Sequence, residues 1–121
     1  MEITRIVAKV GKGKNSSEVY FIVDSGAVYS LLPEEIWKKL KLKPVSEMKF
    51  SLADGTIIKR KVSEARIEYK GIGRTSPVLL GEKNDDALLG AVTLETMGLM
   101  LNPFSRELLP MKMLLAPLRF V

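Results

Sequence analysis

Short apolar or alternating segments, separated by turn residues, dominate the hydrophobic pattern of this chain. Such segments predict β-strands over residues 2–10, 18–24, 48–52, 57–62, 65–69 and 76–80. A turn-rich loop over residues 11–17 separates the first two strands, so we expect them to form a hairpin. The run Ala53-Asp54-Gly55-Thr56 carries the Asp-Gly signal of a second hairpin.

A short helix is expected over residues 33–40. Pro33 suits its first turn, two acidic residues complement the amino end, and two lysines complement the carboxyl end. Ile36, Trp37 and Leu40 share one face of this helix. We therefore expect Trp37 to anchor the helix in the core.

The last third of the chain predicts a second helix and a third hairpin. The apolar run at 87–90 precedes a helix over residues 91–97, and Gly98 stands where a left-handed cap belongs. Residues 99–101 and 107–111 are expected to pair across an intervening turn.

Length and composition indicate one domain. The chain has 121 residues, of which 46% are hydrophobic and 27% charged, an ordinary globular balance with one modest core. Short, evenly spaced strands are typical of small barrels. We predict a single domain over residues 1–121 that is mostly β and folds as a small closed barrel with one or two short helices.

Membrane and nucleic-acid partners are not expected. No apolar run approaches the roughly 20 residues that a membrane helix needs, and the first residues lack the features of a signal peptide. We therefore expect a soluble, cytoplasmic protein. The net charge of +5 is dispersed along the chain and is not interleaved with aromatic residues that would stack on bases. A nucleic-acid-binding barrel is supported by net charge alone.

The chain contains no cysteine and no histidine. This excludes thiol mechanisms, Ser-His triads and imidazole metal sites. An enzyme of this composition takes its proton chemistry from Asp, Glu, Lys or Tyr. We expect neither a metal nor a cofactor.

One carboxylate occupies an unusual place. Asp24 follows directly on an apolar strand segment and is itself followed by Ser25, Gly26 and Ala27. Taken alone, Asp-Ser-Gly commonly makes a simple turn in which the Asp side chain accepts hydrogen bonds from backbone amides. A Leu-Leu-Gly run at 88–90, directly before the second expected helix, accompanies it here.

This combination, with a Gly-tipped hairpin between its two parts, resembles the retropepsin-like aspartic proteases, the clan of retroviral proteases. It is also similar to the protease-like domain of the DNA-damage-inducible ubiquitin-shuttle proteins. The resemblance covers the chain from about residue 18 to residue 111. It implies the retropepsin (acid protease) type of fold and a homodimeric aspartic endopeptidase that binds a peptide or protein substrate in extended conformation.

The resemblance also implies roles for the residues of the first motif. Asp24 is the expected catalytic residue. The Ser25 hydroxyl is expected to bond across the dimer, and Gly26 to let its amide approach the carboxylates. Ala27 and Val28 are expected to lie beside the substrate.

The second hairpin has a default role and an implied one. By default it is a plain turn. Under the resemblance it is the flap that covers the substrate, and its tip residues Ala53, Asp54 and Gly55 bind substrate.

Peptide hydrolysis without a metal, thiol or imidazole needs an acid and a base held together. Two close carboxylates supply both, because like charges cannot both ionise cheaply and one group keeps its proton. The chain holds one Asp-Ser-Gly, so by the logic of the family the second carboxylate is Asp24 of another copy. The apolar neighbours of Asp24 keep water from dispersing this coupling.

The chain also departs from the retroviral pattern. Those enzymes usually carry an Asp and an Arg where this chain has Val28 and Ala91, and their flaps are richer in glycine. Viral subunit contacts and substrate preferences are therefore not carried over. The alternative is an inactive peptide-binding or scaffold dimer that retains the fold. The apolar segment at 113–121 is expected to be covered by the core, by a dimer interface or by another protein.

Overall fold

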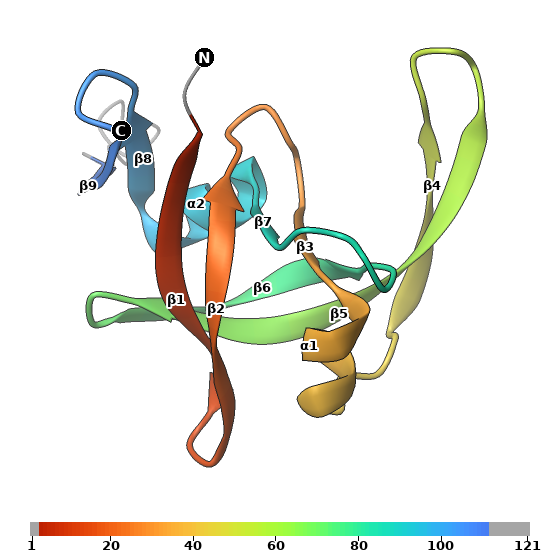
Figure 1. Cartoon of the computed structure of the whole chain (residues 1–121), viewed down its shortest axis with the longest axis horizontal. Helices are drawn as coiled ribbons and strands as arrows, with labels where there is room; N and C mark the ends of the chain where they lie inside the picture. Colours follow the sequence, from red (N-terminus) through yellow and green to blue (C-terminus); the bar gives the residue numbers. More distant parts are fainter. Residues whose placement is uncertain (1–2, 112–121) are drawn as a thin grey trace, which may run out of the picture.

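Figure 1 shows the computed structural model, which describes residues 3–111 as nine strands and two short helices. In chain order these are β1 (Thr4–Lys12), β2 (Asn15–Val23), β3 (Ser30–Leu32), α1 (Glu34–Lys39), β4 (Ser46–Ser51), β5 (Ile57–Tyr69), β6 (Ile72–Leu80), β7 (Leu88–Leu89), α2 (Ala91–Met97), β8 (Leu99–Asn102) and β9 (Glu107–Pro110).

Seven of the strands form one sheet in the order β1-β2-β7-β3-β6-β5-β4. A further pairing between β1 and β5 closes the sheet into a ring and leaves β4 outside it, paired with β5. The pairs β2–β7 and β3–β6 are parallel, whereas the others are antiparallel. The predicted mostly β class is confirmed, with the strands arranged as a ring.

Alternation along β2 shows which side of the sheet is the core. Val19, Phe21 and Val23 are buried, whereas Tyr20 is 64% exposed. Successive side chains of a strand point to opposite faces, so β2 turns its apolar residues inward. Phe21 belongs to a core cluster that other strands and α2 complete, and truncating such a side chain to Ala costs about 3–5 kcal/mol.

The first hairpin is tighter than predicted. β1 and β2 stay paired as far as Lys12 opposite Asn15, so the expected loop over 11–17 shrinks to a turn at Gly13 and Lys14. Gly13 has a φ of 52°, in the left-handed region that two-residue hairpin turns require. Residues 11–12 and 15–17, although typical of turns, are therefore part of the paired strands.

β5 is one strand of 13 residues, whereas the sequence predicted two strands, over 57–62 and 65–69. Ser63 in the polar gap is 3% exposed, and its hydroxyl donates to the carbonyl oxygen of Lys43 at 2.6 Å. With this bond the strand continues through the gap. It pairs with β4 along its first part and with β6 along its second, so that the β4–β5 hairpin projects from the ring (Figure 1).

Both predicted helices and the third hairpin are confirmed. α1 follows Pro33, and Trp37 packs against the core cluster while its Nε1 donates to the carbonyl oxygen of Gly81 at 2.8 Å. Trp37 therefore anchors α1, as expected. α2 ends at Gly98, which has a φ of 70°. β8 and β9 pair as a separate two-stranded sheet.

Two expectations concern parts of the chain beyond this description. The apolar segment at 113–121 lies outside the described residues, and both its covering and the single domain over 1–121 stay predictions. Within residues 3–111, no helix combines the length and the apolar character that crossing a membrane requires.

Candidate active site

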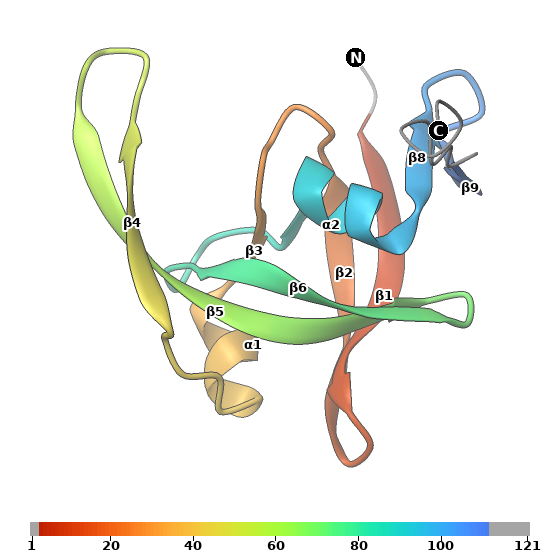
Figure 2. The same cartoon turned by 180° about the vertical axis from the view of Figure 1, so that it is seen from behind.

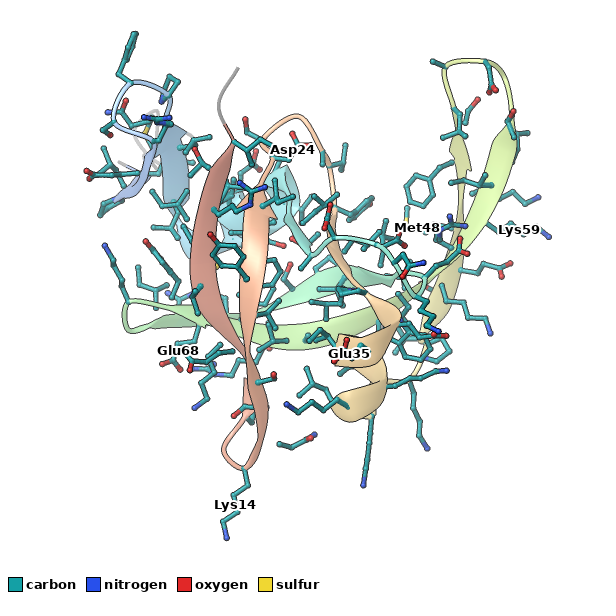
Figure 3. All side chains as sticks on the ribbon, viewed as in Figure 1. Lys14, Asp24, Glu35, Met48, Lys59 and Glu68 are labelled. Atoms are coloured by element: carbon teal, nitrogen blue, oxygen red, sulfur yellow. The ribbon has the colours of Figure 1, made fainter. Side chains whose placement is uncertain are left out.

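Asp24 stands where the chain leaves β2. Val23 before it is buried, and Asp24 is exposed. The amide of Asp24 donates to the carbonyl oxygen of Leu89 at 3.0 Å, so the contact between β2 and β7 extends to this residue. Figure 3 shows Asp24 at the end of the molecule toward which the β4–β5 hairpin also projects.

The residues after Asp24 fold into a tight turn. The amide of Ala27 donates to the carbonyl oxygen of Asp24 at 3.1 Å, and the amide of Gly26 donates to its carboxylate Oδ1 at 3.0 Å. A Cβ on Gly26 would lie 3.2 Å from that Oδ1, and Gly26 is not among the glycines with positive φ. Glycine therefore matters at this position for close approach to the carboxylate. A structural Asp turn makes the same amide bond, so the surroundings decide its role.

The start of α2 is bonded to this turn. The amide of Ala91 donates to the carbonyl oxygen of Ala27 at 2.8 Å, and that of Val92 to the carbonyl oxygen of Val28 at 2.9 Å. The first amides of a helix lack partners within it, so these two carbonyl groups cap α2. Figure 2 shows α2 beside the loop between β2 and β3 from the opposite side to Figure 1.

Gly90 makes this close packing possible. A Cβ at this position would lie 2.6 Å from the backbone carbon and oxygen of Tyr29, and 2.9 Å from the carbonyl oxygen of Ala27. A side chain has no room there unless the backbone moves. The Asp-Ser-Gly-Ala and Leu-Leu-Gly segments, separate in the sequence, therefore form one structural unit.

An apolar pocket of about 240 Å³ lies between this unit and β4. Tyr29 and Phe50 meet at its wall, with ring centroids 6.2 Å apart in an edge-to-face arrangement. Its lining consists of Ala27, Val28, Tyr29, Leu31, Phe50, Leu79 and Leu88. The structure thus brings two expected substrate-binding residues, Ala27 and Val28, to a pocket beside the turn of Asp24.

Leu88 belongs to the Leu-Leu-Gly run, but sequence reasoning did not single out Tyr29, Leu31, Phe50 or Leu79. Phe50 is half-buried, as is Met48 two residues earlier, and the residues on either side of Phe50 are exposed. In the sequence, the apolar Met48 and Phe50 alternate with polar residues, and this was the available signal that one face of the hairpin is directed inward. Tyr29 carried no comparable local signal.

The other expected substrate-binding residues, Ala53, Asp54 and Gly55, form the exposed tip of the β4–β5 hairpin. The amide of Gly55 donates to the carbonyl oxygen of Leu52 at 2.9 Å, and its φ of 87° is typical of three-residue hairpin loops. The amide of Thr56 donates to Asp54 Oδ1 at 2.9 Å. Hydrogen bonds from the Thr56 side chain and amide hold the pKa of Asp54 below its usual 3.8.

The tip and the Asp24 turn are not in direct polar contact. Within residues 3–111, no hydrogen bond or ion pair joins residues 53–55 to residues 24–29. The structure therefore places the tip at the same end of the molecule as Asp24 without bringing the two together.

Ser25 faces a different surface. It lines a mostly apolar pocket of about 260 Å³ together with residues of α2 and β8, namely Ala91, Leu94, Glu95, Leu99, Met100 and Leu101, and with Met111. The Ser25 hydroxyl makes no hydrogen bond to any residue of the described range 3–111.

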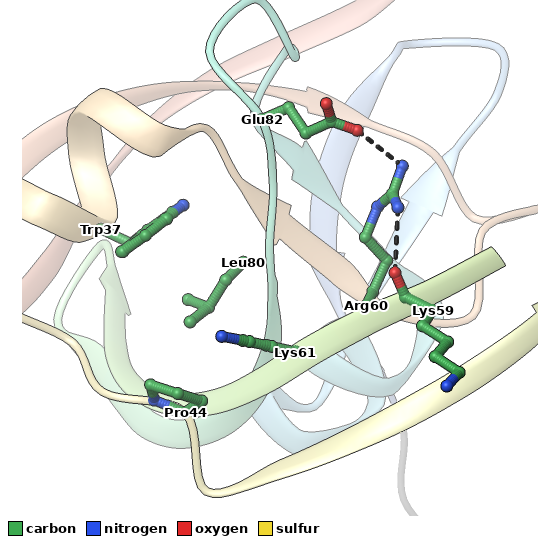
Figure 4. A pocket seen from close by; sticks show the side chains of 7 residues that line it. All are labelled: Trp37, Pro44, Lys59, Arg60, Lys61, Leu80 and Glu82. Atoms are coloured by element: carbon green, nitrogen blue, oxygen red, sulfur yellow. Dashed lines mark hydrogen bonds and ion pairs between the residues drawn. The ribbon is translucent and has the colours of Figure 1, made fainter.

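A third pocket, of about 380 Å³, lies under α1 beside the base of the β4–β5 hairpin (Figure 4). Lys59, Arg60 and Lys61 supply its charge, and Arg60 holds the one acid of its lining, Glu82, at 3.0 Å. It therefore lacks a free carboxylate for acid–base chemistry. Among the described residues, no group of three or more Asp, Glu, His or Cys side chains is arranged to hold a metal ion.

Comparison with known proteins shows the family to which the chain belongs. A family model described as aspartyl protease matches residues 7–92. The structure of EIAV protease complexed with the inhibitor HBY-793 is similar at a TM-score of 0.62 and 16% identity, over 94% of this chain and 94% of that one. The retroviral protease-like domain of Ddi1 from Leishmania major is similar at a TM-score of 0.62 and 12% identity, over 93% and 91%.

A third similar structure is the simian foamy virus (mac) protease, at a TM-score of 0.58 and 21% identity, over 75% of this chain and 91% of that one. Comparison with curated proteins finds none that matches. At these identities the solved structures establish the fold, which is retropepsin-like, and the family model establishes the family. The chain belongs to the aspartyl protease family.

Proposed function

We propose that the protein is a homodimeric aspartic endopeptidase in which Asp24 of each copy supplies half of the catalytic pair. The observation that carries this proposal is the placement of Asp24. It is an exposed carboxylate at the end of a strand with one buried face, and its amide is bonded to Leu89 and its carbonyl oxygen to Ala27. A carboxylate anchored through the backbone on both sides is held in place for chemistry.

The proposed reaction needs two such groups. One ionised Asp24 takes a proton from a water molecule, and the oxygen of that water attacks the peptide carbonyl carbon. The protonated Asp24 of the other copy donates its proton to the carbonyl oxygen. Collapse of the tetrahedral intermediate then breaks the C–N bond, and the nitrogen leaves with a proton returned from the pair.

Within one copy, Asp24 is the only acid in the two segments that form the site, residues 24–29 and 88–92. In the proposed mechanism, the second carboxylate is Asp24 of a second copy. The Ser25 hydroxyl, without a partner in the described chain, and the apolar pocket that it lines support contact at this face. A two-fold axis there would bring the same residues together from both copies.

The proposed substrate is an extended peptide. Strand-like peptides bind by main-chain hydrogen bonds, while pockets for alternate side chains select the sequence. The pocket between Val28 and Phe50 is lined by apolar side chains and Tyr29 and contains no charged group. It fits an apolar substrate side chain.

The alternative is a dimer that binds peptides without cleaving them. Val28 and Ala91 stand where retroviral enzymes usually carry an Asp and an Arg, and both positions belong to the site. The loss of these two charged residues is the observation that favours the alternative. In that case the wild type and Asp24→Asn would bind peptides equally and neither would hydrolyse them.

The test is peptide hydrolysis over an acidic-to-neutral pH series, with and without a pepstatin-type inhibitor. We expect cleavage by the wild type, its loss in the presence of the inhibitor, and a folded but inactive Asp24→Asn variant. Asn keeps the shape of the side chain and loses the acid–base function. Turnover by Asp24→Asn equal to that of the wild type would end the assignment of Asp24.

A further inference from the structure

Three hydroxyl side chains lie in the core behind the Asp24 turn. Ser30 of β3, Thr93 of α2 and Ser76 of β6 are 0%, 0% and 1% exposed. Ser30 Oγ lies 2.5 Å from Thr93 Oγ1, which in turn lies 2.8 Å from Ser76 Oγ. Buried hydroxyls destabilise an apolar core unless they are hydrogen-bonded, so each of these three side chains needs a hydrogen-bond partner.

The two ends of this series determine which atom donates in each bond. The amide of Gly90 donates to Ser30 Oγ at 2.9 Å, and Ser76 Oγ donates to the carbonyl oxygen of Pro77 at 3.2 Å. A hydroxyl has one hydrogen, so Ser76 accepts from Thr93. Thr93 has then given its own hydrogen and accepts from Ser30. All four bonds run in one direction, from Gly90 to Pro77, and each polarises the next.

This directed series begins at Gly90, in the structural unit that joins the Asp24 turn to the start of α2. Gly90 precedes Ala91, whose amide is bonded to the carbonyl oxygen of Ala27 in the turn that Asp24 opens. A shift of Ser30 or of Thr93 would move the Gly90 amide and, with it, the start of α2. Because Ala91 is bonded to the turn, the turn would follow.

We propose that Thr93 is a positioning residue for Asp24. It acts through Ser30 and the Gly90 amide, and its hydroxyl fixes where α2 begins against the turn. The proposal rests on the proposed function, in which Asp24 must meet a second carboxylate within hydrogen-bonding distance. Displacement of a catalytic group by about 1 Å can lower the rate roughly 100-fold.

The chain offers a conservative variant and a matched control. Thr93→Val keeps the shape of the side chain and removes the hydroxyl, whereas Thr93→Ser keeps the hydroxyl and removes a methyl group. Ser63→Ala is the control, because Ser63 also carries a buried hydroxyl but donates it to Lys43, away from the Asp24 turn. Each variant is assayed as a folded dimer, well below its unfolding temperature.

In Thr93→Val we expect kcat per folded dimer to fall roughly 10- to 100-fold. KM should change less, because Leu31, Phe50 and Leu79 still form their part of the substrate pocket. Thr93→Ser should restore kcat to within about threefold of the wild type, and Ser63→Ala should leave it unchanged. A wild-type kcat in Thr93→Val, or an equal loss in Ser63→Ala, would overturn the proposal.

Amide hydrogen exchange gives a second readout that does not depend on activity. In Thr93→Val the amides of Ala91 and Val92 should exchange at least about tenfold faster, while the amide of core residue Ile67 exchanges as in the wild type. Unchanged exchange at Ala91 would overturn the coupling. A wild-type protein that cleaves no peptide contradicts the proposed function, and the exchange result still decides the role of Thr93.

Ser76→Ala covers the case in which Thr93→Val does not fold. It removes the acceptor for Thr93 and leaves Thr93 and Ser30 in place. Faster exchange at Ala91 together with a lower kcat supports the proposal, and wild-type values of both overturn it.

Discussion

The amide nitrogen of Ala91 lies 2.8 Å from the carbonyl oxygen of Ala27. This bond joins two segments that are far apart in the sequence, the turn opened by Asp24 and the helix that follows Leu-Leu-Gly. The turn caps the helix, and the helix fixes the turn. The two motifs therefore form a site by bonding to each other through their backbones.

Gly90→Ala should disrupt this unit. The new Cβ would lie 2.6 Å from backbone atoms of Tyr29, so the backbone of one segment must move. We expect the free energy of unfolding to fall by about 3 kcal/mol, the upper end for overpacking, with loss of activity. Urea unfolding measures the change.

Gly13→Ala is the control for the glycine substitution itself. Gly13 has a φ of 52°, and no atom lies within 4 Å of the place where a Cβ would be, so the variant carries only backbone strain of about 1 kcal/mol. Equal destabilisation by the two variants would contradict the close packing at Gly90.

The turn at the tip of the β4–β5 hairpin should depend on pH in a defined direction. The pKa of Asp54 lies below 3.8 because the ionised carboxylate accepts hydrogen bonds from Thr56. The ionised group therefore stabilises the turn above pH 3.8, and this stabilisation is lost as the pH falls through the folded pKa. The Thr56 amide chemical shift, followed from neutral to acidic pH, reports it.

We expect the Thr56 shift to titrate with a midpoint below 3.8, and Asp54→Ala to remove the titration. A midpoint above 3.8 would mean that the folded state disfavours the ionised carboxylate. That result would contradict the hydrogen bonding described for the tip.

Phe50→Ala should impair substrate capture more than stability. Phe50 forms one wall of the apolar pocket and contacts Tyr29 by its ring edge, an interaction of about 1 kcal/mol. We expect KM to rise roughly tenfold for substrates with a bulky apolar side chain at the matching position. A peptide series that varies this side chain measures the effect.

Met48→Ala is the matched control, because Met48 is also half-buried on β4 but does not line the pocket. An equal change of KM in Met48→Ala would indicate that the hairpin as a whole, and not the pocket wall, had been altered.

Local patterns were sufficient to predict the hairpins between strands adjacent in the sequence, although the first turn is shorter than expected and β5 is one strand. The Asp54-Gly55 hairpin and the Gly98 cap depend on neighbours in the sequence, and the structure confirms both. The parallel pairings of β2 with β7 and of β3 with β6 join distant segments. Neither they nor the three-residue strand β3 has a local signature, and they were not predicted.

The candidate site, too, could be predicted from the sequence only in part. Asp24 and its turn were found from an acid placed after an apolar strand. Ser30 and Thr93 have apolar neighbours in the sequence and lie at buried positions of β3 and α2. Their apolar neighbours were the available signal that these hydroxyls are buried. Their pairing depends on tertiary contact, which a single sequence does not show.

We propose that two Asp24 residues, one from each copy, make one active site. The measurement that tests this most directly is activity after subunit exchange between wild-type chains and an excess of Asp24→Asn chains. Exchange is first verified by mass or with labelled chains. Wild type mixed with an excess of Ser63→Ala, which keeps Asp24, serves as the control.

Mixed dimers hold one competent carboxylate and should be inactive. With a tenfold excess of Asp24→Asn, random pairing should lower activity per wild-type chain to about one eleventh, while the Ser63→Ala mixture retains the activity of its components. Full activity of verified mixed dimers, or of a demonstrated monomer, would contradict the paired Asp24 mechanism.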